Sequence, residues 1–254
     1  GFVERVVFLG FVFDVDVAFA ADDQQAAALT DVGFDFGLVG LGHAFEIPVV
    51  ECQDLVIGQL QGTEILRANH FELGCGQSAG DFSLQGWIDD LRAAISHVIE
   101  ETSPSGVWLV GTNTGGSVAI CVGADDPRVR GAALLSPRAD FDDWAAQPRR
   151  FAEHAREIGA IRTPGYPKQF DEWARELRRF RPVDAARRFA PRPLLVMHGD
   201  DDEAVPTQDA RQMADAHGAA ELRLINGAGH RLRHDPRAVA VLLGWLDRQR
   251  LDVG

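Results

Sequence analysis

An apolar strand that runs into a glycine-framed turn and then a helix is the feature that most restricts this fold. The segment is Val107-Trp-Leu-Val-Gly-Thr-Asn-Thr-Gly-Gly116, and small residues continue to Gly123. A short apolar run such as Val107–Val110 suits a central strand of a parallel sheet, because both faces of such a strand are buried. Only glycines fit two residues either side of Asn113 in so tight a turn. The Asn113 side chain is therefore expected at the top of the sheet, beside a helix N-terminus that favours negative charge. A glycine-rich turn without chemistry would show the same pattern.

Strand and helix patterns alternate along the rest of the chain. An apolar residue recurs every three or four positions between Ile88 and Val98, which predicts an amphipathic helix over Trp87–Glu101. Alternation of this kind implies an α/β fold with a mostly parallel central sheet and helices on both faces, here in a single domain over residues 1–254. Further strands are expected at Glu64–Phe71, Ala132–Leu135, Pro193–Met197 and Glu221–Ile225, and further helices at Gly115–Gly123, Thr207–His217 and Ala238–Arg248.

Two more residues with chemical potential each follow a predicted strand. Asp202 lies in the segment His198-Gly-Asp-Asp-Asp-Glu-Ala-Val-Pro206, and His230 follows it after a strand and the glycine turn Gly227-Ala-Gly229. A histidine in such a place is either structural or able to carry a proton, with a carboxylate fixing its tautomer. We expect Asp202 to orient His230 in this way. The other acidic residues of the loop are expected to be solvated: Asp200, Asp201 and Glu203.

Together these segments resemble the α/β-hydrolase superfamily, and most closely its small esterase-type and acyl-hydrolase members. The order of turn residue, acid and histidine is that of the superfamily, whose nucleophile elbow G-x-S-x-G corresponds to Gly111–Gly115. The segment Gly74-Cys-Gly-Gln-Ser78 is similar to its R-G-x-G-x-S turn, with Leu73 where arginine is usual. The resemblance covers residues 64–250. It implies an α/β-hydrolase fold and a hydrolase of carboxylic esters or thioesters, with no metal and no organic cofactor.

One departure from the superfamily pattern bears directly on activity. Asn113 stands where the nucleophilic serine is usual, and an amide has neither an available lone pair nor an O–H that His230 could deprotonate. Loss of a triad serine lowers turnover by roughly 10⁶-fold. We therefore expect this chain to bind its substrate and turn it over poorly. Thr112 and Thr114 flank the position, but only the central residue of such a turn projects into the site.

Three explanations of Asn113 stay open. The first is a natural or engineered loss of the nucleophile in a hydrolase lineage, which the intact Asp202 and His230 favour. The second is a non-catalytic ligand-binding or sensing protein that keeps the pocket. The third is deamidation of Asn113 to aspartate, the residue that haloalkane dehalogenases use there, although Thr114 follows rather than glycine.

The N-terminal quarter differs in character from the rest of the chain. Residues 1–62 contain ten acidic residues and one basic residue, Arg5. A hairpin of Arg5–Phe11 with Asp14–Phe19 is expected there, followed by a first central strand at Phe36–Leu41 and a helix around Val49–Leu60.

By resemblance, two backbone N–H groups should hold an oxyanion. One is the N–H of Thr114, directly after the turn residue. The other usually comes from a His-Gly turn after the first central strand, and no His-Gly occurs before residue 63. Gly42 or His43, within Gly40-Leu-Gly-His43, is the candidate for that place.

Residues 138–190 lack a strand pattern and predict two or more helices that cap the sheet's carboxyl edge. Their aromatic side chains would line an apolar acyl pocket, unless they only pack the cap helices together. The cap carries 12 basic and 9 acidic residues, which allows an anionic substrate but also fits a solvated helix face. The pocket candidates are Trp144, Phe151, Phe170 and Trp173.

Composition narrows the range of partners. A net charge of −13 argues against binding to a nucleic-acid backbone. No apolar run reaches the roughly 18 residues that a membrane span needs. The 3 cysteines, widely spaced at Cys52, Cys75 and Cys121, form no disulfide or metal-binding pattern and favour reduced thiols in a cytoplasmic protein. The expected partner is a small-molecule ester or thioester, and the sequence does not indicate an oligomeric state.

Overall fold

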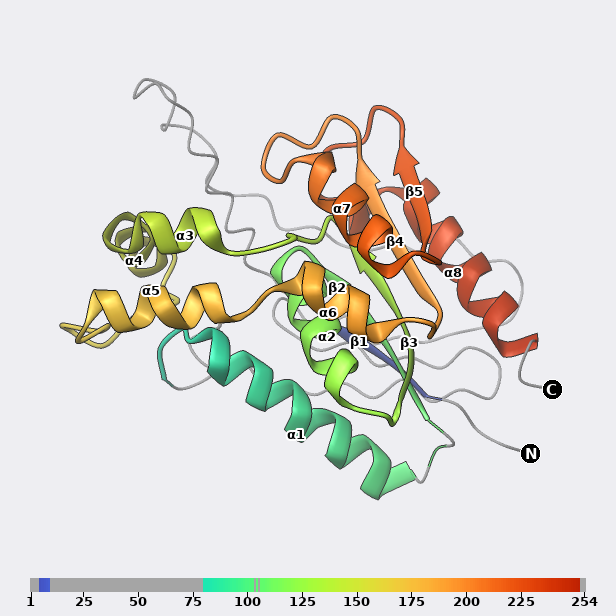
Figure 1. The fold of residues 1–254 in the computed structure, drawn as a ribbon, viewed down its shortest axis with the longest axis horizontal. Coiled ribbons are helices and arrows are strands. Elements are labelled where there is room, and N and C mark those ends of the chain that lie inside the picture. The colour runs from blue at the N-terminus through green and yellow to red at the C-terminus, as the bar shows by residue number, and fades with distance from the viewer. Residues whose placement is uncertain (1–4, 10–79, 103, 105, 252–254) are drawn as a thin grey trace.

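Five parallel strands form the sheet in the computed structural model, which describes residues 5–9, 80–102, 104 and 106–251 (Figure 1). They lie side by side in chain order: β1 (Arg5–Leu9), β2 (Val107–Thr112), β3 (Val129–Leu135), β4 (Leu194–Gly199) and β5 (Glu221–Ile225). Every neighbouring pair of these strands is parallel. Their carboxyl ends therefore meet at one edge of the sheet, where ligands of such folds bind. The predicted α/β class with a parallel sheet is confirmed.

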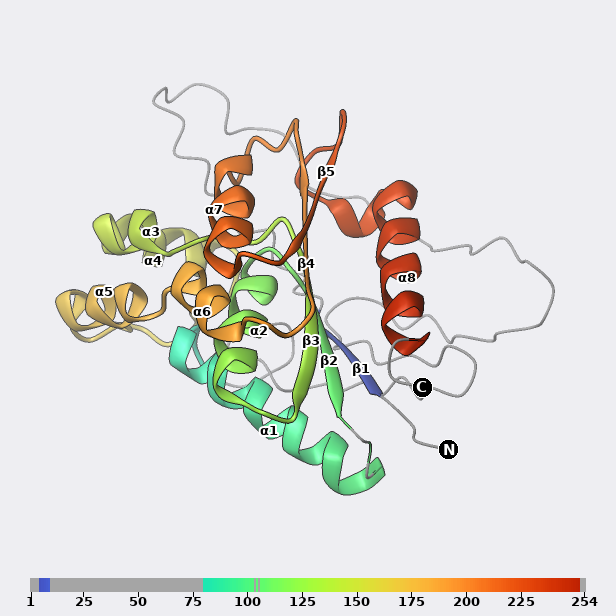
Figure 2. The ribbon, with the colours of Figure 1, turned by 45° about the vertical axis from the view of Figure 1, so that its right-hand side comes forward.

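Helices cover both faces of this sheet (Figure 2). One face carries α1 (Leu84–Thr102), α2 (Thr114–Asp125), α6 (Pro182–Phe189) and α7 (Thr207–His217), and the other carries α8 (Pro236–Leu251). Successive residues of a strand point to opposite faces. Leu109 accordingly joins the core under the first four helices, whereas Trp108 joins the core under α8 and meets Trp245 edge to face at 5.6 Å.

Helix α1 shows why the local sequence specifies its element. Its apolar positions Ile88, Leu91, Ile95 and Val98 are all at most 2% exposed, as the periodicity predicts. Full burial of one such side chain stabilises the fold by about 1.5–3 kcal/mol. The helix begins earlier than predicted because the hydroxyl of Ser83 accepts a hydrogen bond from the Gly86 N–H at 3.1 Å, which caps the first turn.

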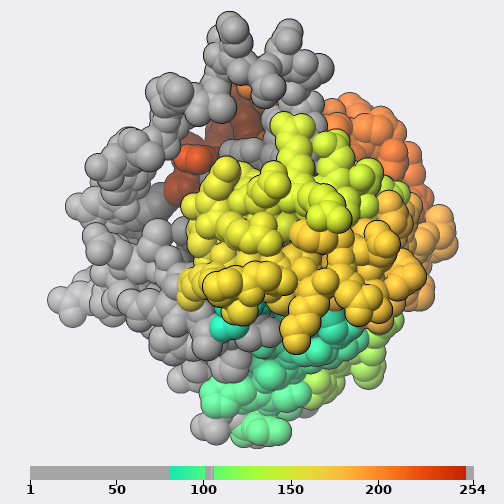
Figure 3. All heavy atoms as spheres, turned by 90° about the vertical axis from the view of Figure 1, so that its left-hand side faces the viewer, coloured from blue at the N-terminus to red at the C-terminus, as the bar shows by residue number. Residues whose placement is uncertain are grey.

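Four helices occupy residues 142–189: α3 (Asp142–Ala146), α4 (Pro148–Glu157), α5 (Phe170–Arg179) and α6. The last of these packs against α2 and α7, so it belongs to the layer on the sheet. Helices α3, α4 and α5 contact one another and gather on one side of the molecule, above α1 (Figure 3).

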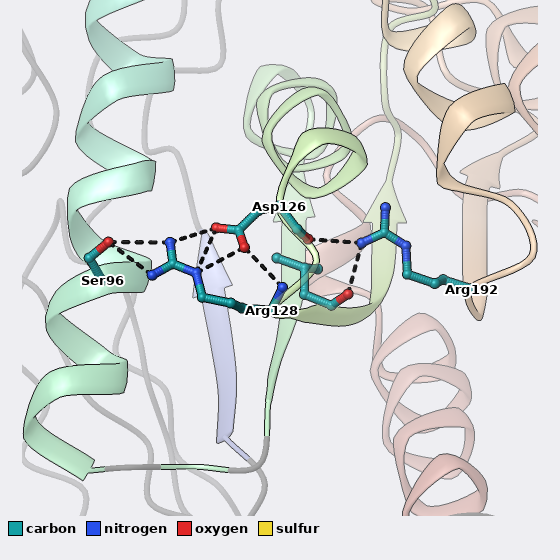
Figure 4. A network of polar contacts seen from close by, with 5 residues as sticks. Ser96, Asp126, Arg128 and Arg192 are labelled. Atoms are coloured by element: carbon teal, nitrogen blue, oxygen red, sulfur yellow. Dashed lines mark hydrogen bonds and ion pairs between the residues drawn. The ribbon is translucent and has the colours of Figure 1, made fainter.

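A polar network holds the amino end of β3 (Figure 4). Arg128 donates to Asp126 Oδ2 at 2.7 Å and to Ser96 Oγ of α1 at 3.2 Å. The half-buried Arg192 donates through Nη1 to the carbonyls of Asp126 and Val129, each at 2.9 Å, and through Nη2 to that of Ala124. These bonds join α1, the loop before β3 and the loop before β4.

The structure places Arg5–Leu9 as a parallel neighbour of β2, with Arg5 paired to Val107 and Leu9 to Gly111. We expected a hairpin of this strand with Asp14–Phe19, and that partner lies outside the described residues. The expected strands Phe36–Leu41 and Glu64–Phe71 and the helix around Val49–Leu60 also lie outside them.

Candidate active site

The turn between β2 and α2 has the strained geometry that its sequence predicts. Asn113 adopts φ 48° and ψ −127°, a conformation that side-chain-bearing residues rarely occupy. A Cβ on Gly111 would lie 2.5 Å from the carbonyl oxygen of Gly115, so glycine is required at that position. The Asn113 N–H donates to the Leu135 carbonyl at 2.8 Å, which fixes the turn to the end of β3.

The side chain of Asn113 is buried without a hydrogen-bond partner. The residue is 4% exposed, and neither atom of its amide meets a donor or acceptor within the described part of the chain. Helix α2 begins at the next residue, Thr114, and the first N–H groups of a helix have no partner within it. The Asn113 amide thus occupies a polar position beside the positive end of the α2 dipole.

Asp202 and His230 meet in the way that the sequence predicts. Nδ1 of His230 lies 2.8 Å from Oδ2 of Asp202, whose side chain is fully buried. The same oxygen lies 2.9 Å from Nε2 of His198, and Oδ1 accepts the N–H groups of Ala204 and Val205 at 2.9 Å each. This arrangement leaves Asp202 with four donors around one carboxylate.

Those donors determine the charge of Asp202. Burial alone would raise the pKa of this carboxyl, but the hydrogen bonds from His198, His230 and the Val205 N–H outweigh burial and hold the pKa well below its usual range. Asp202 is therefore ionised at neutral pH. An ionised partner on Nδ1 favours the tautomer of His230 that presents Nε2 as the acceptor.

The end of β3 contributes a residue that the sequence analysis did not single out. Ser136 is 1% exposed, has φ 49°, and donates its hydroxyl hydrogen to the His230 carbonyl at 3.0 Å. Its N–H donates to the Met197 carbonyl at the end of β4. A second strained strand end therefore lies beside Asn113 and holds the loop that carries His230.

The three other acidic residues of this loop lie at the surface, as expected. Asp201 and Glu203 are exposed, as expected of a solvated loop. Asp200 is exposed too, and it also accepts hydrogen bonds from the Gly227 N–H and from the Asn226 amide. These two partners follow β5, far along the sequence, and no local pattern marks them.

Asn113, Ser136, Asp202 and His230 follow four consecutive strands of the sheet, β2 to β5. The register pairs Thr112 with Leu135, Leu135 with Met197, and Gly199 with Ile225, so these strand ends form one continuous edge. Gly42 and His43, the candidates for the second oxyanion donor, lie outside the described residues.

The strained turn between β2 and α2 and the Asp202–His230 pair lie at one edge of the sheet. Comparison with known proteins then identifies the family. A model described as "Alpha/beta hydrolase family" matches residues 38–242 of the chain. The chain belongs to the α/β-hydrolase family. A comparison with curated proteins gave no match.

Solved structures of this family share the fold at low sequence identity. Est1E from Butyrivibrio proteoclasticus with ferulic acid bound is 20% identical, with a TM-score of 0.55, over 72% of this chain and 75% of that one. The α/β hydrolase GrgF from Penicillium sp. sh18 is 20% identical, with a TM-score of 0.54, over 72% and 78%. Rv0554 from Mycobacterium tuberculosis is 21% identical, with a TM-score of 0.53, over 74% and 80%.

In this α/β hydrolase the cap aromatics form a packed cluster. Trp144, Phe151 and Trp173 are 0%, 1% and 4% exposed, and their rings stack at centroid distances of 4.2 and 5.2 Å. Phe170 is partly buried and lies under the Arg149 guanidinium, 4.5 Å from its carbon. Core packing thus accounts for the first three rings, and a role of these four residues in lining a substrate pocket stays a prediction.

The described residues show neither a membrane-spanning helix nor a cluster of metal ligands. None of their helices is both long and apolar enough to span a membrane. Over the same residues, no three side chains of His, Cys, Asp or Glu come together as metal ligands would.

Proposed function

We propose that this chain comes from a hydrolase lineage that acts on carboxylic esters or thioesters. The observation that carries the proposal is the Asp202–His230 pair at the same sheet edge as the strained Asn113 turn. In an active parent, a serine at position 113 would attack the carbonyl. His230 would accept its proton and return it to the leaving group, and Asp202 would orient the imidazole. The chain is proposed to act as one domain in the cytoplasm, on a small-molecule substrate and without a cofactor.

The oxyanion that forms in this reaction needs donors at the turn. The Thr114 N–H is the proposed first donor, because it opens α2 directly after position 113. Gly42 or His43 is the proposed second donor. Trp144, Phe151, Phe170 and Trp173 are the proposed apolar wall on the cap side.

Asn113 makes the present chain a weak catalyst in this proposal. The amide cannot attack a carbonyl, so turnover should fall by roughly 10⁶-fold relative to a serine enzyme. The alternative is a non-catalytic ligand-binding or sensing protein on the same scaffold. The buried Asn113 amide has no hydrogen-bond partner among the described residues. A ligand that supplies the missing hydrogen bonds would favour that alternative.

The proposal is tested by hydrolysis of short p-nitrophenyl esters by three proteins: the unsubstituted chain, Asn113→Ser and Asn113→Ala. We expect the serine variant to gain several orders of magnitude in kcat/KM, and the alanine variant to stay as slow as the unsubstituted chain. Adding His230→Ala to the serine variant should remove the gain. If the unsubstituted chain already matches the serine variant, another residue attacks and the assignment of position 113 is wrong. If the serine variant melts cooperatively but hydrolyses nothing, the ligand-binding alternative gains support.

A further inference from the structure

Arg138 is a buried cation close to the Asn113 turn. It follows β3 by three residues, and its side chain is 5% exposed. Its N–H donates to the Ser117 hydroxyl at 2.9 Å, and that hydroxyl in turn donates to the Arg138 carbonyl at 2.9 Å. The Ser117 N–H donates to the Asn113 carbonyl at 3.2 Å. One residue of α2 therefore joins the backbone of Arg138 to the turn.

Among the described residues, hydrogen-bond acceptors meet only one end of the Arg138 guanidinium. Nη1 donates to Oδ2 of Asp143 at 2.9 Å, and the guanidinium carbon lies 5.0 Å from the ring centre of Trp144. Nε and Nη2 are buried and meet no acceptor among the residues that the structure describes. These two nitrogens share one edge of the planar group and direct their N–H bonds in parallel, which matches the two oxygens of a carboxylate.

Trp144, over whose ring the Arg138 guanidinium lies, carries a third donor without an acceptor. The indole Nε1 of Trp144 is buried and likewise meets no acceptor within the described residues. A buried N–H without a partner is costly, and the cost is greater when the group is charged. Since all three atoms only donate, the ligand that would satisfy them must supply acceptors.

The carboxylates near Arg138 leave this edge open. Asp143 is 36% exposed and takes Nη1 alone. Asp209, in the first turn of α7, accepts a hydrogen bond from the Ala139 N–H at 3.0 Å and interacts with Arg138 only electrostatically. Burial raises the pKa of the Asp209 carboxyl, although the nearby charge of Arg138 opposes that shift.

We propose that the Nε–Nη2 edge of Arg138, together with the indole N–H of Trp144, binds a carboxylate of the substrate. The inference rests on the proposed function and names its substrate class: half-esters or half-thioesters of dicarboxylic acids. The site is shielded from bulk water, so each hydrogen bond in it is strengthened. A ligand must displace the atoms that cover the edge, and its association should be slower than diffusion.

The first test uses the unsubstituted chain, because Asn113 lets a substrate bind without rapid turnover. Isothermal titration calorimetry would compare the monomethyl and dimethyl esters of succinic, glutaric and adipic acids. We expect at least one monoester to bind tenfold or more tightly than its diester, since a hydrogen bond to a charged group is worth about that factor. Equal affinities across all three pairs, or no binding of any monoester, would overturn the proposal.

Variants then assign the effect to Arg138. Arg138→Gln should abolish the preference for the monoester, and Arg138→Lys, which keeps the charge but loses the planar edge, should restore only part of it. Arg149→Gln is the matched control, because Arg149 is an exposed cap arginine that also lies over an aromatic ring. An unchanged preference in a folded Arg138→Gln protein contradicts the proposal. If neither Arg138 variant folds, the comparison of the two esters on the unsubstituted chain still decides.

The same compounds separate this inference from the proposed function. An Asn113→Ser protein that hydrolyses neutral esters but shows no preference for half-esters would refute the inference and keep the function. A chain that prefers monoesters through Arg138, and whose serine variant hydrolyses none of them, would keep the inference and refute the function.

Discussion

Replacement of Asn113 by glycine should stabilise the protein, although it changes the residue at the centre of the candidate site. Two features of Asn113 lower the stability of the folded protein. The backbone holds φ 48° and ψ −127°, which glycine adopts without penalty. The amide is buried with both its polar atoms unpartnered within the described residues. A site that keeps strain and unsatisfied polarity trades stability for function.

The magnitude follows from these two costs. Removal of the unpartnered amide relieves about 1–3 kcal/mol, and release of the backbone strain adds about 1–2 kcal/mol. The greater freedom of glycine in the unfolded chain reduces this stabilisation by about 0.5–1 kcal/mol. The small cavity that the side chain leaves behind reduces it by about 1 kcal/mol. The net gain is about 2 kcal/mol, or about 4–8 °C in Tm for a domain of this size.

Thermal and urea unfolding of the unsubstituted chain and Asn113→Gly would measure the gain. Asn226→Ala is the control, because Asn226 is exposed and its amide is bonded to Asp200 at 3.1 Å. That substitution should leave Tm unchanged or lower it slightly. A lower Tm for Asn113→Gly, with the control as expected, would refute the reasoning and mean that the asparagine amide is satisfied in the folded protein.

Three further predictions concern the same sheet edge. Gly111→Ala should lower the free energy of unfolding by about 3 kcal/mol, since its Cβ would meet backbone at 2.5 Å. Gly244→Ala should raise it by up to about 1 kcal/mol, because Gly244 lies on the exposed side of α8 and its Cβ would lie 3.9 Å from the nearest atom. Urea titrations that rank the two variants the other way would contradict the steric argument. Ser136→Ala, made in the serine variant of position 113, should lower kcat about tenfold with little change in KM, because the hydroxyl holds the loop that carries His230. An unchanged kcat would mean that the hydroxyl does not position His230. Because the folded protein lowers the pKa of Asp202, the ionised carboxylate stabilises the fold fully above pH 3.8, the ordinary pKa of aspartate, and this stabilisation is lost as the pH falls further. Asp202→Asn should therefore make Tm fall less steeply with decreasing pH. An equally steep fall would show that other carboxyl groups control the acid dependence.

Local sequence determined the parts of the fold that were predicted best. The glycine spacing around Asn113 reflects a steric requirement within five residues, and the structure shows the expected strained turn. The spacing of apolar residues in α1 likewise reflects one buried helix face. In α8 apolar spacing alone does not identify the buried face, because Leu243 is 43% exposed whereas Ala238 and Trp245 are buried. Several apolar stripes were available on that helix, and only the tertiary contact chose between them.

Contacts between distant segments were beyond sequence reasoning. No pattern in the sequence marked Ser136, yet its hydroxyl donates to the His230 carbonyl across 94 positions. Arg138 was counted among the charges of the cap, where its burial could not be foreseen. Asp202 and His230 were found because their places follow a known order along the chain, and their contact at 2.8 Å still required the fold to bring them together.

The Arg192 network bears on how freely this protein can change its chemistry. It joins two loops at the amino end of β3, while the candidate site lies at the other end of that seven-residue strand, about 20 Å away. Bonds at that end therefore support the sheet without contacting Asn113, Ser136, Asp202 or His230. Such a division lets one end of the molecule supply a margin of stability while the other accumulates substitutions, among them an asparagine at position 113, without loss of the fold. A laboratory search for new activities on this scaffold should therefore randomise the loops after β2, β3, β4 and β5 and leave Asp126, Arg128 and Arg192 untouched.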